Sequence, residues 1–130
     1  MRPISEKEIQ AVLRLDGPAR FSHFVKRVVD FEEAWGLWSE GWALMENSEG
    51  TQVFPLWPAR EYAELNRIGD WAEYEPKAIS LAELLDNYLP DFAARGILPG
   101  VFPTPKGKGV TLSANELAAS LRKIESENYG

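Results

Sequence analysis

The 130-residue chain carries 14 basic and 20 acidic side chains, for a formal net charge of −6, and 45% of its residues are hydrophobic. This length and composition are typical of one folded domain and exclude an intrinsically disordered chain. The acidic balance argues against nucleic acid and anionic lipid as partners, because the protein would repel both. We therefore expect a single globular domain over residues 1–130.

The chain contains no cysteine, which excludes disulfides and thiolate zinc sites and fits a reducing compartment. Residues 1–8 lack the apolar core of a signal peptide. No run approaches the roughly 18 apolar residues of a membrane span. These features predict a soluble cytoplasmic protein without membrane contact.

Three serines are each followed, three positions later, by a glutamate, which is the spacing of a capping box at a helix start. The pairs are Ser5 with Glu8, Ser80 with Glu83, and Ser113 with Glu116. Apolar residues recur at helical spacing after each pair, so we expect three helices there. Gly96 is expected to end the middle helix, and Pro90 predicts a kink or early break within it.

Two further helices are expected. One runs over 18–33, where apolar residues recur every three or four positions, with Asp16 as its cap. The other is short: it begins at Pro58, a residue favoured at the first helical position, and stops at Gly69.

Strand signals lie between these helices. Residues 35–38, 42–45 and 52–57 are aromatic or apolar and are separated by turn-like segments, which predicts an antiparallel meander. Residues 97–102 and 109–112 predict a later hairpin.

Residues 77–79 predict a short edge strand. Pro55 and Pro99 interrupt two candidate strands and predict edges or bulges, because proline cannot donate to a ladder. Together these elements predict an α+β fold with a mainly antiparallel sheet of about 4–6 strands and about five helices packed against it.

His23 is the chain's one histidine and therefore its first candidate for a general base. No Gly-x-Ser-x-Gly elbow accompanies it, so no nucleophile is indicated. Arg20, His23 and Arg27 share one helical face by spacing, and a solvated basic stripe is the expected arrangement. The acidic runs at 30–33 and 73–75 follow no metal-loop pattern and are expected to be solvated. No metal or cofactor is predicted.

The segment 103–109 contains Lys106, Gly107 and Lys108. Glycine lets backbone N–H groups approach an anion closely and lysine adds positive charge, so this loop is a candidate for a phosphate or carboxylate. A plain hairpin turn explains the same glycines. The loop lacks the spacing of a nucleotide-binding Walker loop.

All five tryptophans lie between residues 35 and 71. Trp35 and Trp38 point to opposite faces of a strand by its period of two, so at least one is expected outside the core. With Trp42 and Trp57 they are candidates for a binding surface, because indoles are enriched in interfaces and ligand pockets. The alternative is that these large side chains complete a small core.

Five short motifs occur in chain order: Asp-Phe-Glu-Glu-Ala-Trp-Gly-Leu at 30–37, Gly-Trp-Ala-Leu at 41–44, Leu-Trp-Pro at 56–58, Tyr-Glu-Pro at 74–76 and Val-Phe-Pro-Thr-Pro at 101–105. Together they resemble a family of small bacterial proteins known as domain of unknown function 2750. The resemblance spans nearly the whole chain and implies a bacterial, cytosolic, single-domain protein. It implies no activity and carries over no catalytic residue.

More weakly, the segments 53–58, 79–85 and 109–113 are similar to the N-terminal domain of the enhanced-serine-sensitivity protein B family. The order of strand, helix, strand, helix and hairpin is comparable. This chain has an added pair of helices at its N-terminus, and no function is carried over.

Three functions stay open at this point. The tryptophans, the acidic charge and the lack of a catalytic constellation favour a non-enzymatic protein-interaction module, with a protein partner or self-association. The alternative is a protein that binds a small anionic ligand through an aromatic pocket and the Lys106-Gly107-Lys108 loop. A hydrolase built on His23 or the clustered carboxylates is the least favoured of the three.

Overall fold

The computed structural model describes residues 4–107 and 109–129, so Lys108 lies outside the described residues. Within these ranges the chain forms five helices, one of them with a π-helical turn inside it, a short 3-10 turn and six strands. The chain therefore has an α+β fold, as the sequence predicts. No helix in these ranges combines the length and the apolar character needed to cross a membrane.

The first two helices begin at the predicted caps. Helix α1 covers Glu6–Leu13, and the Ser5 hydroxyl accepts the Glu8 N–H at its start. Helix α2 covers Gly17–Phe31, and the Asp16 carboxylate accepts the Ala19 N–H. These side chains satisfy N–H groups that have no partner within the helix.

The predicted helix that starts after Ser80 continues through Pro90 and does not break there. It consists of α4 (Leu81–Glu83), the π-helical turn η2 (Leu84–Tyr88) and α5 (Leu89–Arg95), with Ser80 as N-cap. Proline has no N–H group, so in a regular α-helix the carbonyl four residues before Pro90 would lack its hydrogen bond. The wider π-helical turn η2 lies just before Pro90, where this bond would be missing. Gly96, with φ of 70°, ends the helix as predicted.

The remaining helices are α3 (Arg60–Glu64) and α6 (Ala114–Tyr129). Helix α3 begins two residues after Pro58 and ends well before Gly69, so it is shorter than expected; the 3-10 turn η1 (Gly69–Trp71) follows it. At the start of α6 the capping box is reciprocal, because Ser113 and Glu116 each accept the other's backbone N–H.

The strands form two sheets, so the predicted three-stranded meander is wrong for its first strand, whereas its second and third strands do pair antiparallel with each other. In the first sheet, β1 (Glu33–Trp38) pairs antiparallel with β4 (Glu75–Ser80), which is longer than the expected edge strand. After β1 the chain turns tightly, with Glu40 at φ of 57°, and folds back against the end of this strand: Trp38 and Trp42 form a backbone bridge, and the Ala43 N–H donates to the Leu37 carbonyl at 2.8 Å.

The second sheet has the order β2-β3-β5-β6. Its strands are β2 (Met45–Glu46), β3 (Gln52–Leu56), β5 (Leu98–Val101) and β6 (Val110–Thr111). The pair β3 and β5 is parallel, and the other pairs are antiparallel. The predicted hairpin is therefore present as β5 and β6.

Pro55 and Pro99 lie in the two inner strands, so their predicted placement at edges or bulges is wrong. The outer strands β2 and β6 are only two residues long. On one edge of β3, Val53 pairs with β2 and Trp57 pairs with Trp35. Pro55 lies between these two pairs, so its missing N–H removes no hydrogen bond of the sheet.

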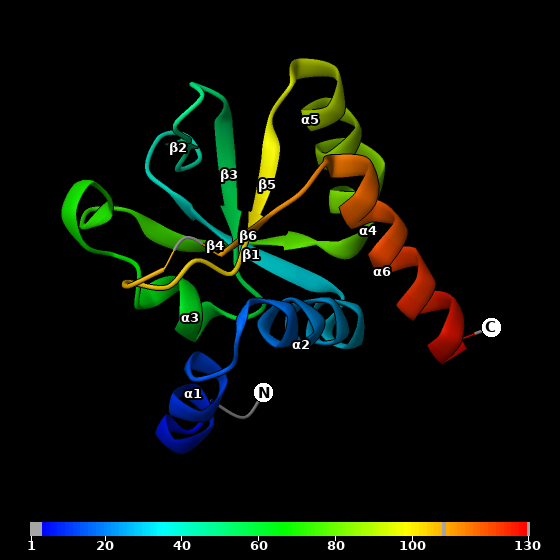
Figure 1. Ribbon diagram of the computed structural model, residues 1–130, viewed down its shortest axis with the longest axis horizontal. Coiled ribbons are helices and arrows are strands. Elements are labelled where there is room, and N and C mark those ends of the chain that lie inside the picture. Colours follow the sequence, from blue (N-terminus) through cyan, green and yellow to red (C-terminus); the bar gives the residue numbers. More distant parts are fainter. Residues whose placement is uncertain (1–3, 108, 130) are drawn as a thin grey trace.

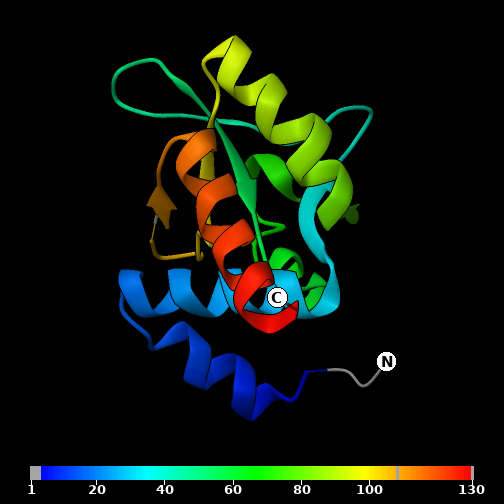
Figure 2. The ribbon, with the colours of Figure 1, turned by 90° about the vertical axis from the view of Figure 1, so that its right-hand side faces the viewer.

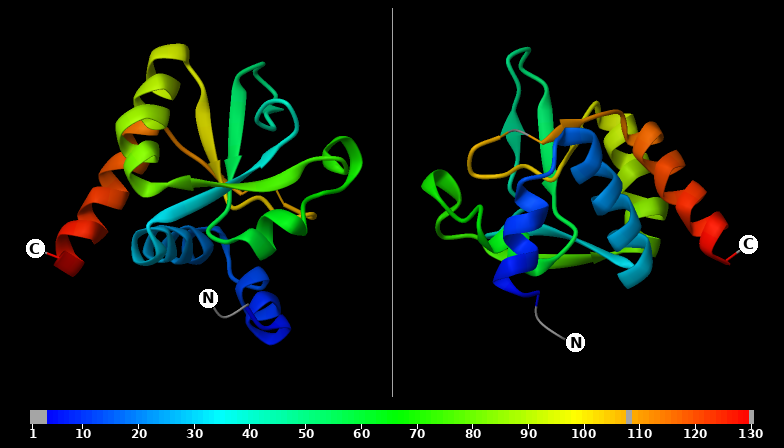
Figure 3. Two further views of the ribbon diagram at one scale, coloured as in Figure 1. Left: turned by 180° about the vertical axis from the view of Figure 1, so that it is seen from behind. Right: turned by 60° about the horizontal axis from the view of Figure 1, so that its bottom comes forward.

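Trp35 and Trp57 join the two sheets through their backbones. Each N–H donates to the other residue's carbonyl at 2.8 Å. As Figure 1 shows, β1 and β4 consequently cross the direction of β3 and β5. Helix α6 packs against α2, α5 and β5, which Figure 2 shows from the side. Helix α1 lies outermost, beyond α2 (Figure 3).

Candidate functional site

Two of the tryptophans predicted to bind a partner, Trp35 and Trp57, pack in or against the hydrophobic core. Trp57 is 0% exposed, and its indole N–H donates to the Pro103 carbonyl at 2.8 Å. Trp35 is half-buried, and its indole N–H donates to the Glu33 carboxylate at 2.8 Å. With their backbones joining the sheets, these residues offer little surface to a ligand.

Trp38 and Trp42 lie together at the surface, both half-buried. Their ring centroids are 5.1 Å apart in an edge-to-face arrangement, and a backbone bridge links the two residues. The Nζ atom of Lys77 on β4 lies 3.9 Å from the Trp38 ring centroid and 5.5 Å from that of Trp42. Such a cation–π contact contributes about 0.5–1 kcal/mol at an exposed site, enough to favour this arrangement of the rings.

Trp42 packs on further aromatic side chains. Its ring centroid lies 5.5 Å from that of Phe54 and 6.0 Å from that of Tyr88. Gly36 makes this approach possible, because a Cβ atom there would lie 2.9 Å from the Trp42 ring. A shallow hollow of about 200 Å³ is lined by these three aromatic residues and by Leu44, among others.

Leu44, which is 37% exposed, also lines a larger hollow of about 460 Å³. This hollow lies between residues 44–46, the 66–71 segment and the 103–107 loop. Ile68, 55% exposed, and the half-buried Trp71 belong to its apolar lining. We call the surface that joins the two hollows the tryptophan face; its members are Trp38, Trp42, Leu44, Ile68 and Trp71.

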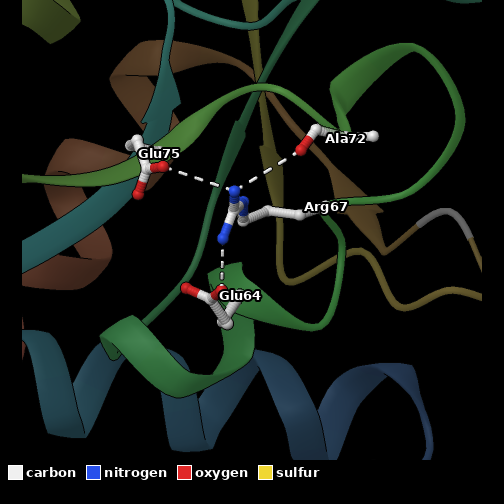
Figure 4. Close-up of polar contacts among 4 residues, drawn as sticks. All are labelled: Glu64, Arg67, Ala72 and Glu75. Atoms are coloured by element: carbon white, nitrogen blue, oxygen red, sulfur yellow. Dashed lines mark hydrogen bonds and ion pairs between the residues drawn. The ribbon is translucent and has the colours of Figure 1, made fainter.

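Arg67 holds the 66–74 loop, which carries part of the tryptophan face (Figure 4). Its Nη1 atom lies 2.5 Å from Glu64 Oε1, and its Nη2 atom lies 3.4 Å from the Ala72 carbonyl and 3.3 Å from Glu75 Oε1. The hydrogen bond to Glu64 raises the pKa of Arg67, so the guanidinium stays charged. These contacts tie α3, the loop and the start of β4 together.

The 103–107 loop makes a plain turn: the Thr104 N–H donates to the Gly107 carbonyl at 2.9 Å, and the Gly107 N–H to the Thr104 carbonyl at 3.2 Å. Gly107 lines the 460 Å³ hollow. Lys106 is exposed and lines a separate cleft of about 340 Å³ together with Arg14 of the α1 C-cap. The third residue of the predicted anion loop, Lys108, lies outside the described residues.

The basic stripe of α2 is not a solvated face, contrary to the sequence expectation. The Nε atoms of Arg20 and Arg27 and the Nε2 atom of His23 are buried and have no partner among the described residues. The reason is that α1 and α3 pack over the stripe: Glu8 lies 3.8 Å from Arg27, and the ring centroid of Tyr62 lies 6.3 Å from that of His23.

His23 and Tyr62 are both held neutral near pH 7. Burial, and then the charge of Arg27, lower the pKa of His23, against a smaller opposing effect of Glu8. Burial, followed by the charge of Glu8, raises the pKa of Tyr62 to about 12. Together with Arg20 and Arg27, these residues form a partly buried polar cluster under α1.

Within the described part of the chain, no group of three or more His, Asp or Glu side chains could hold a metal ion. The carboxylates of Asp30 and Glu32 in the first acidic run and of Glu73 and Glu75 in the second are exposed.

A family model described as protein of unknown function (DUF2750) matches residues 21–121. The chain belongs to this family. The matched part of this DUF2750 protein begins in α2, ends in α6 and includes both sheets and the tryptophan face. No curated protein and no solved structure matches the chain. The comparisons do not confirm the similarity to the enhanced-serine-sensitivity protein B family.

Among the residues that the sequence singled out for binding, the structure brings Trp38 and Trp42 together and separates them from the buried Trp57. Sequence reasoning missed four residues that belong to this surface or contact it. They are Leu44, Ile68, Trp71 and Lys77. Trp71 left a signal as the fifth tryptophan of the 35–71 segment, and Ile68 left one as a large apolar side chain just before Gly69, where the predicted helix stops.

Proposed function

We propose that the protein is a non-enzymatic, cytoplasmic protein-binding module and that the tryptophan face is its contact surface. The observation that carries this proposal is a continuous surface grouping: Trp38 packs on Trp42, Trp42 shares the smaller hollow with Leu44, and Leu44 shares the larger one with Ile68, the latter two 37% and 55% exposed. Large aromatic side chains dominate the binding energy of protein interfaces, and aliphatic neighbours exclude water around them.

Charge around the tryptophan face also suits a protein contact. Lys77 stacks on Trp38, Asp91 pairs with Arg95 at 3.0 Å beside the smaller hollow, and Glu46 lines the larger one. Interfaces commonly combine an apolar centre with a polar rim of this kind.

The proposal is tested by affinity capture from a lysate of the source organism, quantified by mass spectrometry. Leu44→Lys places a charge in the centre of the face without opening a cavity in the core, because Leu44 is already exposed. Phe31→Lys is the matched control, since Phe31 is 43% exposed on α2 and lines neither hollow. We expect Leu44→Lys to remove a protein that both the unmodified chain and Phe31→Lys retain. Equal capture by all three would contradict the proposal.

A second candidate is binding of a small anion in the cleft between α1 and the 103–107 loop. Arg14 and Lys106 both line this cleft, although the protein as a whole is acidic. A thermal-shift screen of anionic metabolites would show stabilisation that Arg14→Gln and Lys106→Gln remove. The exposed Lys7→Gln is the control. If no anion stabilises the protein, or if the effect survives both changes, this candidate is wrong.

A further inference from the structure

We propose that the 460 Å³ hollow of the tryptophan face receives a basic side chain, arginine or lysine, from the protein partner. This inference rests on the proposed function. The hollow is of the size of ligand pockets, which commonly range over about 300–1,000 Å³. Its lining combines an aromatic ring, carboxylates and a buried amide, which is the chemistry that recognises a cation.

The first observation is charge. Glu46 and Asp70 both line the hollow, and neither is in a salt bridge with another described residue. None of the described residues that line this hollow is basic. Lys106 lines the separate cleft, together with Arg14. A cation in the hollow would therefore gain attraction from two carboxylates, whereas the sequence alone suggested an anion beside this loop.

The second observation is the aromatic wall. Trp71 lines the hollow and is held edge-to-face against the buried Trp57, with ring centroids 6.2 Å apart. Arg67 fixes the loop that carries it. An indole held in place attracts ammonium and guanidinium groups, as the contact of Lys77 with Trp38 shows elsewhere on this face.

The third observation is a buried amide. Asn66 lines the hollow and is only 5% exposed. Its Nδ2 atom donates to the Tyr62 carbonyl at 2.9 Å, and its Oδ1 atom is not one of the buried side-chain atoms left without a partner. This oxygen can accept a hydrogen bond, which a guanidinium or ammonium group in the hollow would supply.

The occupant is a basic segment of another protein and not a second copy of this chain. The chain has a net charge of −6, and two copies meeting through this face would bring the carboxylates of Glu46 and Asp70 together. Like charges that meet in an interface disfavour it. A basic partner, in contrast, complements both the hollow and the whole molecule.

The test follows the five indole N–H signals by NMR while N-acetyl-arginine amide is added, with N-acetyl-norleucine amide and N-acetyl-glutamate amide as neutral and anionic probes. We expect the arginine probe alone to shift the Trp71 signal in a saturable way, with little change at Trp57. The double variant Glu46→Gln/Asp70→Asn should weaken this binding about fivefold, because each exposed carboxylate contributes modestly. Glu32→Gln/Glu83→Gln removes the same charge at exposed positions outside the hollow and should not.

No shift of Trp71, an equal shift with norleucine amide, or binding that survives the loss of both carboxylates would each overturn the inference. The two proposals can fail separately. If Glu46→Gln/Asp70→Asn retains a captured partner that Leu44→Lys loses, the face binds a protein but the hollow does not take its basic side chain. If Leu44→Lys loses nothing, the proposed function itself fails.

Discussion

At the scale of single residues, Tyr62 carries a buried hydroxyl without a hydrogen-bond partner. Its side chain is 1% exposed, and its hydroxyl has no partner among the described residues. A buried hydroxyl without a hydrogen bond costs roughly 1–3 kcal/mol. We therefore expect Tyr62→Phe to raise the free energy of unfolding by about 1 kcal/mol in urea titrations. Tyr88→Phe, at a half-buried position, should change it little, and a loss of stability in Tyr62→Phe would contradict this reading.

His23 predicts how stability depends on pH. Its pKa is lowered in the folded state by burial and by Arg27, so the folded protein binds a proton less readily than the unfolded chain, whose histidine titrates near pH 6.5. The histidine's contribution to stability is thus fully present above about pH 6.5 and is lost as the pH falls through the lowered folded pKa. Glu8 and Arg27 are the charged groups that face it from α1 and α2.

The measurement is the free energy of unfolding between about pH 7 and pH 5, before most carboxylates titrate. The unmodified protein should lose stability over this interval, and His23→Gln should lose less. Parallel curves for the two proteins would show that the imidazole is not the group responsible.

At the scale of elements, the caps explain why helix starts were predictable. Ser113 and Glu116 satisfy each other's backbone N–H groups, and α6 packs on α2, α5 and β5. Removing such a cap costs about 1 kcal/mol, so Ser113→Ala should lower the free energy of unfolding by that amount. Ser126→Ala, at an exposed position inside the same helix, is the control and should be neutral or slightly stabilising.

Arg67 is expected to affect the local order of the 66–74 loop and not the stability of the whole protein. Exposed ion pairs contribute about 0–1 kcal/mol, so Arg67→Gln should hardly change global stability. It should, however, speed hydrogen exchange in this loop, because the contact with the Ala72 carbonyl is lost. Arg95→Gln breaks an exposed pair with Asp91 and should leave the loop unchanged. Unchanged exchange in Arg67→Gln would show that packing alone holds the loop.

Strand order was not predictable at this scale, and the reasons are physical. Pairing of β1 with β4 joins residues about forty positions apart, and the parallel pair of β3 and β5 needs an intervening helix. Neither leaves a local signal comparable to a cap or a turn. The strands β2 and β6 have only two residues each, which is too short to show an alternation of apolar and polar side chains.

For the whole molecule, the class of fold and the helices followed from sequence, while the candidate site followed only in part. Trp38 and Trp42 were identified because indoles are conspicuous, but only the crossing of the two sheets buries Trp57. Trp71 ends the 3-10 turn η1, and Leu44 lies just before β2 although the sequence predicted it within a strand, so no local pattern shows that they line one hollow. The partly buried polar cluster was missed because spacing on α2 cannot show that α1 and α3 cover it.

A protein-binding tryptophan face is tested most directly by hydrogen exchange of the intact chain with and without the partner that it captures. We expect slower exchange over residues 38–46 and 66–72, which carry the face and the walls of the larger hollow. Slower exchange confined to α2 and α6, where Phe21 and Ile124 line a groove of about 230 Å³, with no change in those two segments, would contradict it.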